Sequence, residues 1–257
     1  MGPREHGIRG VLCRPRSIGG ENCEAEWREV SLGSAEVRVL VPDAHSALER
    51  AAEDGTDVYW CTLWPSALPV AQALHGAPPR VDVRGKAVVD VGCGLGLAGV
   101  SAAAAGAGSV VFTDFVAEAV GLAVQSAREA VVAGAHGAAV TGSVLNWSDI
   151  DAWPAAAYDV ALLADVLYEA SAVDALVVLL RRILKAEGSI AVVADQAKRT
   201  PSNRARFVAG MISAGFSVAD EPVAWTEQDR RVLHQVLGFG EGATPPPTIH
   251  LLICTRS

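Results

Sequence analysis

Apolar and polar positions follow two alternating periods along residues 86–214, and this alternation predicts the fold. Short runs rich in valine and alanine, such as VVDV at 88–91, are typical of strands buried on both faces, and each is followed by a segment with helical spacing. The expected strands cover 86–92, 109–114, 138–145, 158–165 and 189–195, and the expected helices cover about 96–105, 116–133, 171–186 and 202–214. Strict strand–helix alternation of this kind indicates a parallel sheet with right-handed crossovers.

The segments on either side of this core have a different pattern. Residues 27–41 alternate apolar and polar positions around a Gly-Ser turn, which predicts a β-hairpin before the core. Ser66 is expected to cap a lead-in helix over about 66–76, which a glycine and a proline pair end. The last apolar runs, 216–225 and 248–255, are separated by a polar stretch and predict an antiparallel hairpin at one edge of the sheet.

The chain length agrees with one domain. A chain of 257 residues is long enough for one α/β domain with extra elements and short for two catalytic domains. We therefore expect one domain over 27–257, with its core over 86–257 and a seven-stranded, mostly parallel sheet with one antiparallel edge strand. Residues 1–26 are expected to form a separate segment, either disordered or, since residues 1–20 hold four arginines and one acid, an organelle transit segment.

Composition and charge narrow the classes of partner. The net charge of −8 disfavours nucleic acid, because binding to a phosphate backbone needs a surplus of lysine and arginine. No run of about 18 apolar residues lacks a glycine or a charge, so a membrane span is not expected. The five cysteines and six histidines are scattered without metal-ligand spacing, which indicates reduced thiols, an intracellular protein and no metal site. We expect a cytoplasmic location, or an organelle if residues 1–26 are a transit segment, and a monomer is the simplest expectation.

The strongest local signal is the sequence VVDVGCGLGLAG at 88–99. Gly92, Gly94 and Gly96 follow a buried strand and precede a helix, so the backbone can approach a ligand and the helix offers free N–H groups. The spacing G-x-G-x-G differs from the G-x-G-x-x-G of dinucleotide sites, and no Walker lysine follows. Both NAD(P) and ATP are therefore disfavoured.

Two acids flank this loop. Asp90 lies inside the strand, where a carboxylate among valines is costly unless it meets loop N–H groups or the ammonium of a ligand. The alternative for Asp90 is a carboxylate that only ties the loop together. Asp114 ends the second strand, 22 residues after Gly92, where Rossmann-like sites place an acid that accepts hydrogen bonds from ribose hydroxyls.

The motifs LWPSAL, DVGCGLGLAG, FTD, LNW and ADVLYE, within about 57–195, resemble those of the seven-β-strand protein lysine methyltransferases, called methyltransferase family 16. The resemblance implies a Rossmann-like class I methyltransferase fold, S-adenosyl-L-methionine (AdoMet) as the cofactor and a protein lysine as the acceptor. The family's cofactor positions match Trp64, Gly92, Cys93, Gly94, Asp114, Trp147 and Ala164, and the expected site also includes Asp90, Gly96, Phe115 and Asn146. Trp147 is expected to pack on the adenine ring.

The family's D-x-x-Y motif after the fourth strand matches Asp165 and Tyr168. The resemblance implies that Asp165 orients the acceptor amine and accepts its hydrogen bond, while Tyr168 lines the entry channel. The alternative is structural, with Asp165 capping the next helix and Tyr168 packing under the loop. Leu95 and Asn146 depart from the family's frequent Thr and Asp, and both departures concern hydrogen bonding on the adenine side.

Other functions remain open at the level of sequence. They are a small-molecule methyltransferase, a non-catalytic AdoMet-binding protein and an NAD(P)-dependent oxidoreductase. The N-terminal block is a short hairpin with little helix, which favours an open site and a macromolecular acceptor. Four basic residues after the fifth strand are expected to be either a solvated surface or a contact for an acidic partner; they are Lys198, Arg199, Arg204 and Arg206.

Overall fold

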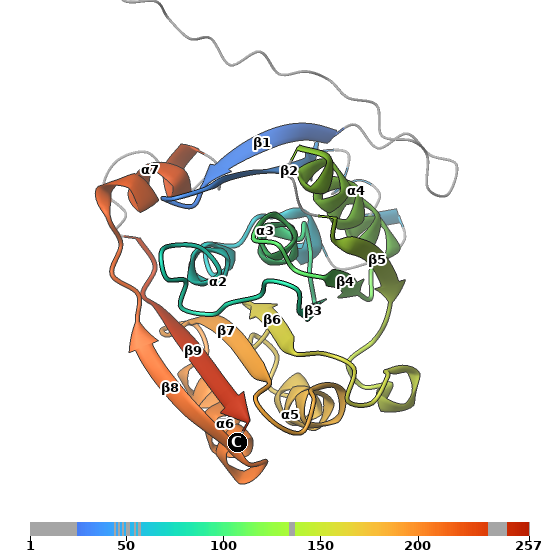
Figure 1. The fold of residues 1–257 in the computed structure, drawn as a ribbon, viewed down its shortest axis with the longest axis vertical. Coiled ribbons are helices and arrows are strands. Elements are labelled where there is room, and N and C mark those ends of the chain that lie inside the picture. The colour runs from blue at the N-terminus through green and yellow to red at the C-terminus, as the bar shows by residue number, and fades with distance from the viewer. Residues whose placement is uncertain are drawn as a thin grey trace, which may run out of the picture.

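The computed structural model describes most of the chain (Figure 1). The described residues are 25–43, 45, 47, 49, 52, 53, 55, 58–133, 137–235 and 246–256. Nearly all of the N-terminal segment expected over 1–26, with its arginines and two of the five cysteines, lies outside the described residues. The transit-segment hypothesis therefore stays a prediction.

A seven-stranded sheet with the order β5-β4-β3-β6-β7-β9-β8 forms the centre of the domain. The strands are β3 (Ala87–Val91), β4 (Ser109–Asp114), β5 (Ala139–Val144), β6 (Val160–Ala164), β7 (Ile190–Gln196), β8 (Phe216–Pro222) and β9 (Ile249–Arg256). Neighbouring strands are parallel from β5 to β7, and β9 is antiparallel to both β7 and β8. The expected sheet is confirmed, and its single antiparallel strand lies beside the edge strand β8.

Helices cover both faces of this sheet (Figure 1). They are α2 (Ala67–Ala73), α3 (Leu97–Ala104), α4 (Ala117–Ala133), α5 (Ala172–Ile183), α6 (Pro201–Ser213) and α7 (Glu227–Gln235), with short 3-10 turns at Tyr59–Cys61 and Ile150–Ala152. Val88 and Leu162 join the core beneath α2, α3 and α4, whereas Val89 and Leu163 join the core beneath α5 and α6. Successive strand residues thus face opposite helical layers, as the continuous apolar runs predict.

The expected N-terminal hairpin is present as β1 (Ala25–Ser31) and β2 (Glu36–Pro42), which form a separate two-stranded sheet. It lies over α3 and α4 (Figure 1). Val37 and Val39 are buried in the same core as these helices, and the Leu40 N–H donates to Ser126 Oγ of α4 at 2.9 Å. The hairpin therefore extends the helical layer on one face of the domain.

The capping role expected for Ser66 is wrong. Ser66 stands at the first turn of α2, but its side chain makes no capping hydrogen bond, and its buried Oγ has no partner among the described residues. Leu68, Val70 and Ala71 are completely buried, so tertiary packing rather than a cap determines where this short helix forms.

Helix α7 lies in the stretch that the sequence pattern assigned to a polar connection. Its first turn is closed by reciprocal hydrogen bonds: the Asp229 N–H donates to Thr226 Oγ1 at 3.1 Å, and the Thr226 N–H donates to Asp229 Oδ2 at 2.8 Å. This arrangement is a capping box. Gln72 Nε2 of α2 donates to the other oxygen of Asp229 at 2.6 Å, which joins α7 to the body of the domain.

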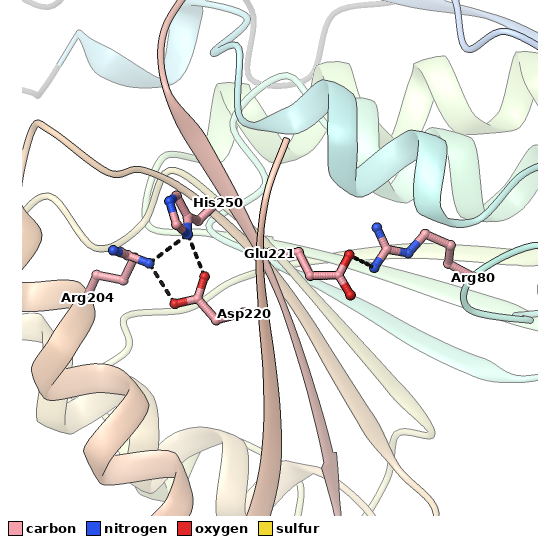
Figure 2. Close-up of polar contacts among 5 residues, drawn as sticks. All are labelled: Arg80, Arg204, Asp220, Glu221 and His250. Carbon is pink, nitrogen blue, oxygen red and sulfur yellow. Dashed lines mark hydrogen bonds and ion pairs between the residues drawn. The ribbon is translucent and has the colours of Figure 1, made fainter. Parts of the chain in front are cut away.

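Ion pairs hold the antiparallel edge pair of β8 and β9 from both sides (Figure 2). Asp220 points toward α6, where it accepts a hydrogen bond from Arg204 Nη1 at 2.7 Å and lies 2.5 Å from His250 Nδ1. The next residue, Glu221, points to the opposite face and pairs with Arg80 at 2.8 Å. Because neighbouring strand residues face opposite sides, one dipeptide can tie the edge to both layers.

We expect Thr226→Ala to lower the free energy of unfolding by about 1 kcal/mol, because it removes the hydroxyl from the α7 capping box. Thr226→Ser keeps an acceptor oxygen and should remain close to the wild type. Urea unfolding followed by circular dichroism measures both variants. An equal decrease in the free energy of unfolding in both variants would contradict a stabilising role for the capping hydroxyl.

Candidate active site

A cavity opens at the carboxyl ends of β3, β4 and β6. In the strand order, β4 lies on one side of β3 and β6 on the other, so the connections leave in opposite directions at this point. Open α/β sheets bind ligands in the crevice at such a switch point. The lining residues are Tyr59, Trp60, Thr62, Leu63, Trp64, Ala67, Gly92, Cys93, Gly94, Leu95, Gly96, Leu97, Asp114, Phe115, Trp147, Ala164, Asp165, Val166 and Tyr168.

The glycine loop forms one wall of this cavity, and both backbone and packing require its glycines. Gly92, Gly94 and Gly96 have φ values of +65°, +49° and +77°, a region that other residues rarely adopt. A Cβ at Gly92 would lie 2.6 Å from the ring of Trp147, and one at Gly96 would lie 2.5 Å from Ala123 of α4. The loop therefore passes close to both neighbours and exposes backbone to the cavity.

Asp114 is held rigidly at the end of β4. Its Oδ2 accepts the N–H of Gly94 at 3.0 Å, and its Oδ1 accepts the N–H of Val116 at 3.1 Å. The residue is 6% exposed and lines the cavity. A carboxylate has about four acceptor positions, so a side chain of this kind can accept hydrogen bonds from backbone donors and from the hydroxyls of a ribose.

A neighbouring hollow shares Phe115, Trp147 and Tyr168 with this cavity. Asn146 lines only this second hollow, and its Oδ1 accepts the N–H of Ser148 at 2.9 Å. The structure therefore brings Trp147 and Phe115 to the main cavity and places Asn146 beside it.

Asp90 was expected in the cofactor site, but its side chain does not line the cavity. It is 2% exposed, and its Oδ2 accepts the N–H of Gly99 in α3 at 2.8 Å. Burial raises the pKa of this carboxyl to about 7. The alternative reading, a carboxylate that ties the loop and helix to the strand, describes these contacts better.

Asp165 lies at the other end of the cavity, directly after β6. Its φ is +58°, which is uncommon for a residue with a side chain and is often found at functional sites. The side chain is 2% exposed; Oδ2 accepts a hydrogen bond from Gln196 Nε2 at 2.7 Å and lies 3.6 Å from Arg199 Nη1. Oδ1 is buried and has no hydrogen-bond partner among the described residues. Asp165 therefore does not act as a helix cap, and one oxygen is available to a donor.

A second carboxyl, Asp195 at the end of β7, lies next to this group. The Asp165 N–H donates to Ala194 O at 2.9 Å, which places Asp165 and Asp195 on neighbouring strand ends. Both oxygens of Asp195 are buried without a hydrogen-bond partner among the described residues. Burial, with a smaller effect from the Asp165 charge, raises the pKa of Asp195 to about 7, and burial also raises the pKa of Asp165. We expect the pair to titrate as a coupled unit.

Three aromatic side chains line the cavity near Asp165. The ring of Tyr59 lies 5.9 Å from the ring of Trp64 and 5.9 Å from that of Tyr168, in edge-to-face arrangements. The sequence motifs indicated Trp64 and Tyr168. Tyr59 was missed because nothing in its local sequence marks it, although it stands five residues before Trp64.

The described residues also bear on metal binding, thiol reactivity and membrane spanning. Among them, no group of three His, Cys, Asp or Glu side chains is arranged to hold a metal ion. None of the three described cysteines forms a disulfide, and burial raises the pKa of Cys93 in the glycine loop, which keeps this thiol protonated. No helix within the described ranges combines the length and apolar character needed to cross a bilayer.

Comparison with known proteins agrees with this geometry. A family model described as "Lysine methyltransferase" matches residues 45–213, and the chain belongs to this family. The zebrafish (Danio rerio) protein N-lysine methyltransferase METTL21A is 32% identical over 114 residues, which are 41% of this chain and 47% of that protein. The match thus spans about half the length of this relative. The resemblance to methyltransferase family 16 is confirmed.

Solved structures show the same fold at low sequence identity. SMU.776, in complex with S-adenosylhomocysteine (SAH), has a TM-score of 0.55 at 12% identity and covers 89% of this chain and 56% of that one. The [4+2]-cyclase SpnF has a TM-score of 0.52 at 21% identity, and the match covers 74% of this chain and 79% of SpnF. A SAM-dependent methyltransferase from Methanosarcina mazei has a TM-score of 0.50 at 15% identity, and the match covers 69% of this chain and 94% of that protein. These likenesses establish the Rossmann-like class I methyltransferase fold and, since they include a cyclase, show that it serves more than one reaction.

We expect Gly92→Ala to destabilise the domain by about 1–3 kcal/mol more than Gly33→Ala. Both glycines have positive φ, but a Cβ at Gly33 meets nothing within 4 Å, whereas a Cβ at Gly92 meets the Trp147 ring. The difference between the variants in urea unfolding isolates the contact with Trp147. Equal losses would show that the backbone conformation alone requires Gly92.

Asp90→Asn is expected to change how stability depends on pH. Because the folded pKa of Asp90 is raised, folded protein binds this proton more tightly, and the group's contribution to stability falls as pH rises from about 4 to about 7. The asparagine keeps an acceptor for Gly99, so the stability of the variant relative to wild type should increase across this window. Urea unfolding at pH 5, 6, 7 and 8 tests this, with the exposed Asp151→Asn as the control for net charge; a constant difference would contradict it.

Proposed function

We propose that this protein is an AdoMet-dependent methyltransferase that transfers methyl groups to a lysine ε-amine of a protein substrate. The observation that carries the proposal is the buried Asp165 carboxylate, which lines the same cavity as the glycine loop and Asp114. One end of this cavity thus suits a nucleoside, and the other suits an amine.

The residues present fit AdoMet. The glycine loop lets the backbone approach the ligand, Asp114 can accept hydrogen bonds from the ribose, and Trp147 supplies a flat apolar surface for adenine. Membership of the lysine methyltransferase family supports the same cofactor. When bound, AdoMet supplies an activated methyl group on a sulfonium ion. The protein therefore needs no nucleophile of its own.

The proposed work of the chain is to orient the amine and remove its charge. Asp165 Oδ1 would accept a hydrogen bond from the acceptor nitrogen, and Tyr168 would line the path by which it enters. A free lysine has a pKa of about 10.4, and partial burial in this cavity would lower it. Holding amine and methyl group in line at near-attack distance would then supply much of the rate enhancement. The leaving proton can pass to water or to the Asp165 and Asp195 pair.

A macromolecular acceptor fits the surroundings of the cavity better than a small molecule does. None of the residues of the β1 and β2 hairpin lines the cavity, and the hairpin packs on α3 and α4 instead. It therefore does not form a lid over the acceptor end. The relative METTL21A is named as a protein N-lysine methyltransferase, which supports the same class of acceptor.

Further expectations about partners and location belong to this proposal. The net charge of −8 continues to disfavour nucleic acid, and no membrane association is expected. The scattered cysteines favour an intracellular, cytoplasmic protein, and we expect it to act as a monomer.

Incubation with tritiated AdoMet and a cell lysate, followed by gel fluorography, tests the proposal. We expect a labelled protein band whose hydrolysate contains methyl-lysine. Asp165→Asn should reduce the labelling at least about 100-fold, because the amide lacks the negative charge that faces the amine, and losing one preorganised electrostatic contact in an active site costs roughly 10²–10³ in rate. Asp174→Asn, an exposed carboxylate on α5, is the matched control and should label normally.

The other outcomes of this experiment have distinct meanings. Label in the small-molecule fraction would identify a small-molecule methyltransferase, and SAH binding in calorimetry without any transfer would identify a silent binder. Methyl-histidine or a methylated N-terminus in the band would show that the acceptor is a histidine or an N-terminal amine and not a lysine. Undiminished labelling by Asp165→Asn would contradict the role given to this carboxylate.

A further inference from the structure

The guanidinium of Arg199 lies among the aromatic rings at the acceptor end of the cavity. Its central carbon is 5.0 Å from the ring centroid of Trp64, 5.8 Å from that of Tyr168 and 5.9 Å from that of Tyr59. Its Nη1 lies 3.6 Å from Asp165 Oδ2. Cation–π attraction acts within about 6 Å of a ring, so one cation here faces three rings and a buried carboxylate.

The backbone of Arg199 is fixed relative to these groups. Its N–H donates to Gln196 O at 3.0 Å, which closes a turn after β7. The following segment is joined to the D-x-x-Y loop, because Thr200 Oγ1 and Asn203 Nδ2 both donate to Leu167 O, at 3.1 and 2.8 Å. The Arg199 side chain is 32% exposed, so its flexible stem can reach solvent without movement of the loop.

This environment selects for a cation. Aromatic faces attract ammonium and guanidinium groups, and methylated ammonium groups bind well in such cages. Asp165 adds a negative charge that is screened little, because its side chain is buried. An acceptor lysine approaching Asp165 would bring a second positive charge to the same place, and two cations cannot share it.

We propose that Tyr59, Trp64, Tyr168 and Asp165 form a cation cage, that Arg199 is its resident cation, and that the acceptor ammonium binds by displacing Arg199. An arginine suits this position because its guanidinium stays protonated in proteins and therefore remains a permanent cation. A neutral acceptor gains little from the cage and competes poorly with Arg199, so the exchange selects side chains that arrive as ammonium groups. The bound ammonium then loses its proton, to water or to the Asp165 and Asp195 pair, before it accepts the methyl group. The lysine acceptor rests on the proposed function, whereas the cage and its occupant do not.

Binding of tetramethylammonium chloride by the full chain tests this proposal, with neopentyl alcohol as the uncharged probe of similar shape. Calorimetry compares wild type, Arg199→Gln and Arg199→Lys. Removing a resident cation should tighten tetramethylammonium binding by about tenfold, the size expected for the loss of a partly desolvated cation–π competitor. Arg199→Lys keeps a charge and should bind as wild type does, and neopentyl alcohol should show no change.

The cage itself is tested by adding Tyr168→Ala to Arg199→Gln, which should abolish the gain. Equal tetramethylammonium affinity in wild type and Arg199→Gln, with SAH binding intact, would overturn the proposal. If Arg199→Gln does not fold, the wild type still gives an answer by NMR. The Arg199 side-chain resonances, assigned by their absence in Arg199→Lys, should be shifted upfield by the rings, and random-coil positions would overturn the proposal.

Kinetics separate this role from a merely structural one. With an identified protein substrate, Arg199→Gln should lower KM, because the competitor for the cage is removed. A lower kcat with unchanged KM would contradict displacement. A gain in tetramethylammonium binding without methyl transfer to any protein would keep the cage and reject the proposed lysine acceptor.

Discussion

The left-handed turn that follows β3 is the constraint on which the rest of the site depends. The chain leaves a buried strand at Gly92 and enters α3 at Leu97, with positive φ values at three glycines between them. Because these residues lack side chains, Trp147 can approach Gly92, and α4 can approach Gly96. The same turn points the Gly94 N–H at Asp114, so the acid and the loop hold each other in place at the cavity wall.

Much of the fold could be predicted because burial on both faces leaves a strong pattern. The five strands from β3 to β7 begin and end within two residues of their expected limits. Helix α7 was missed because the stretch is polar, yet the T-x-x-D sequence at 226–229 is a capping signal that could have indicated it. The capping role predicted for Ser66 was wrong for a different reason. Serine is typical of helix caps, but tertiary packing buries this side chain and leaves its Oγ without a partner among the described residues.

The candidate site was predictable where its residues directly follow strands. Asp114, Ala164 and Asp165 lie at strand ends, which a parallel sheet brings to one edge, and family motifs marked Trp64 and Tyr168.

The cation cage was not predictable, because Tyr59 and Arg199 come from segments far apart in sequence. Arg199 lies in a basic run that resembles ordinary surface; in the structure Arg199, Arg204 and Arg206 all pair with acids of the same chain. Asp90 was also predicted in the site, whereas in the structure its carboxylate binds Gly99, which belongs to the helix behind the loop.

The structure of the protein in complex with SAH tests the central claim most directly, namely that one cavity places a methyl donor beside Asp165. The account predicts ribose hydroxyls within hydrogen-bond distance of Asp114, the adenine ring against Trp147 and the ligand sulfur facing the end lined by Asp165 and Tyr168. SAH bound elsewhere, or with its sulfur directed away from Asp165, would contradict the account.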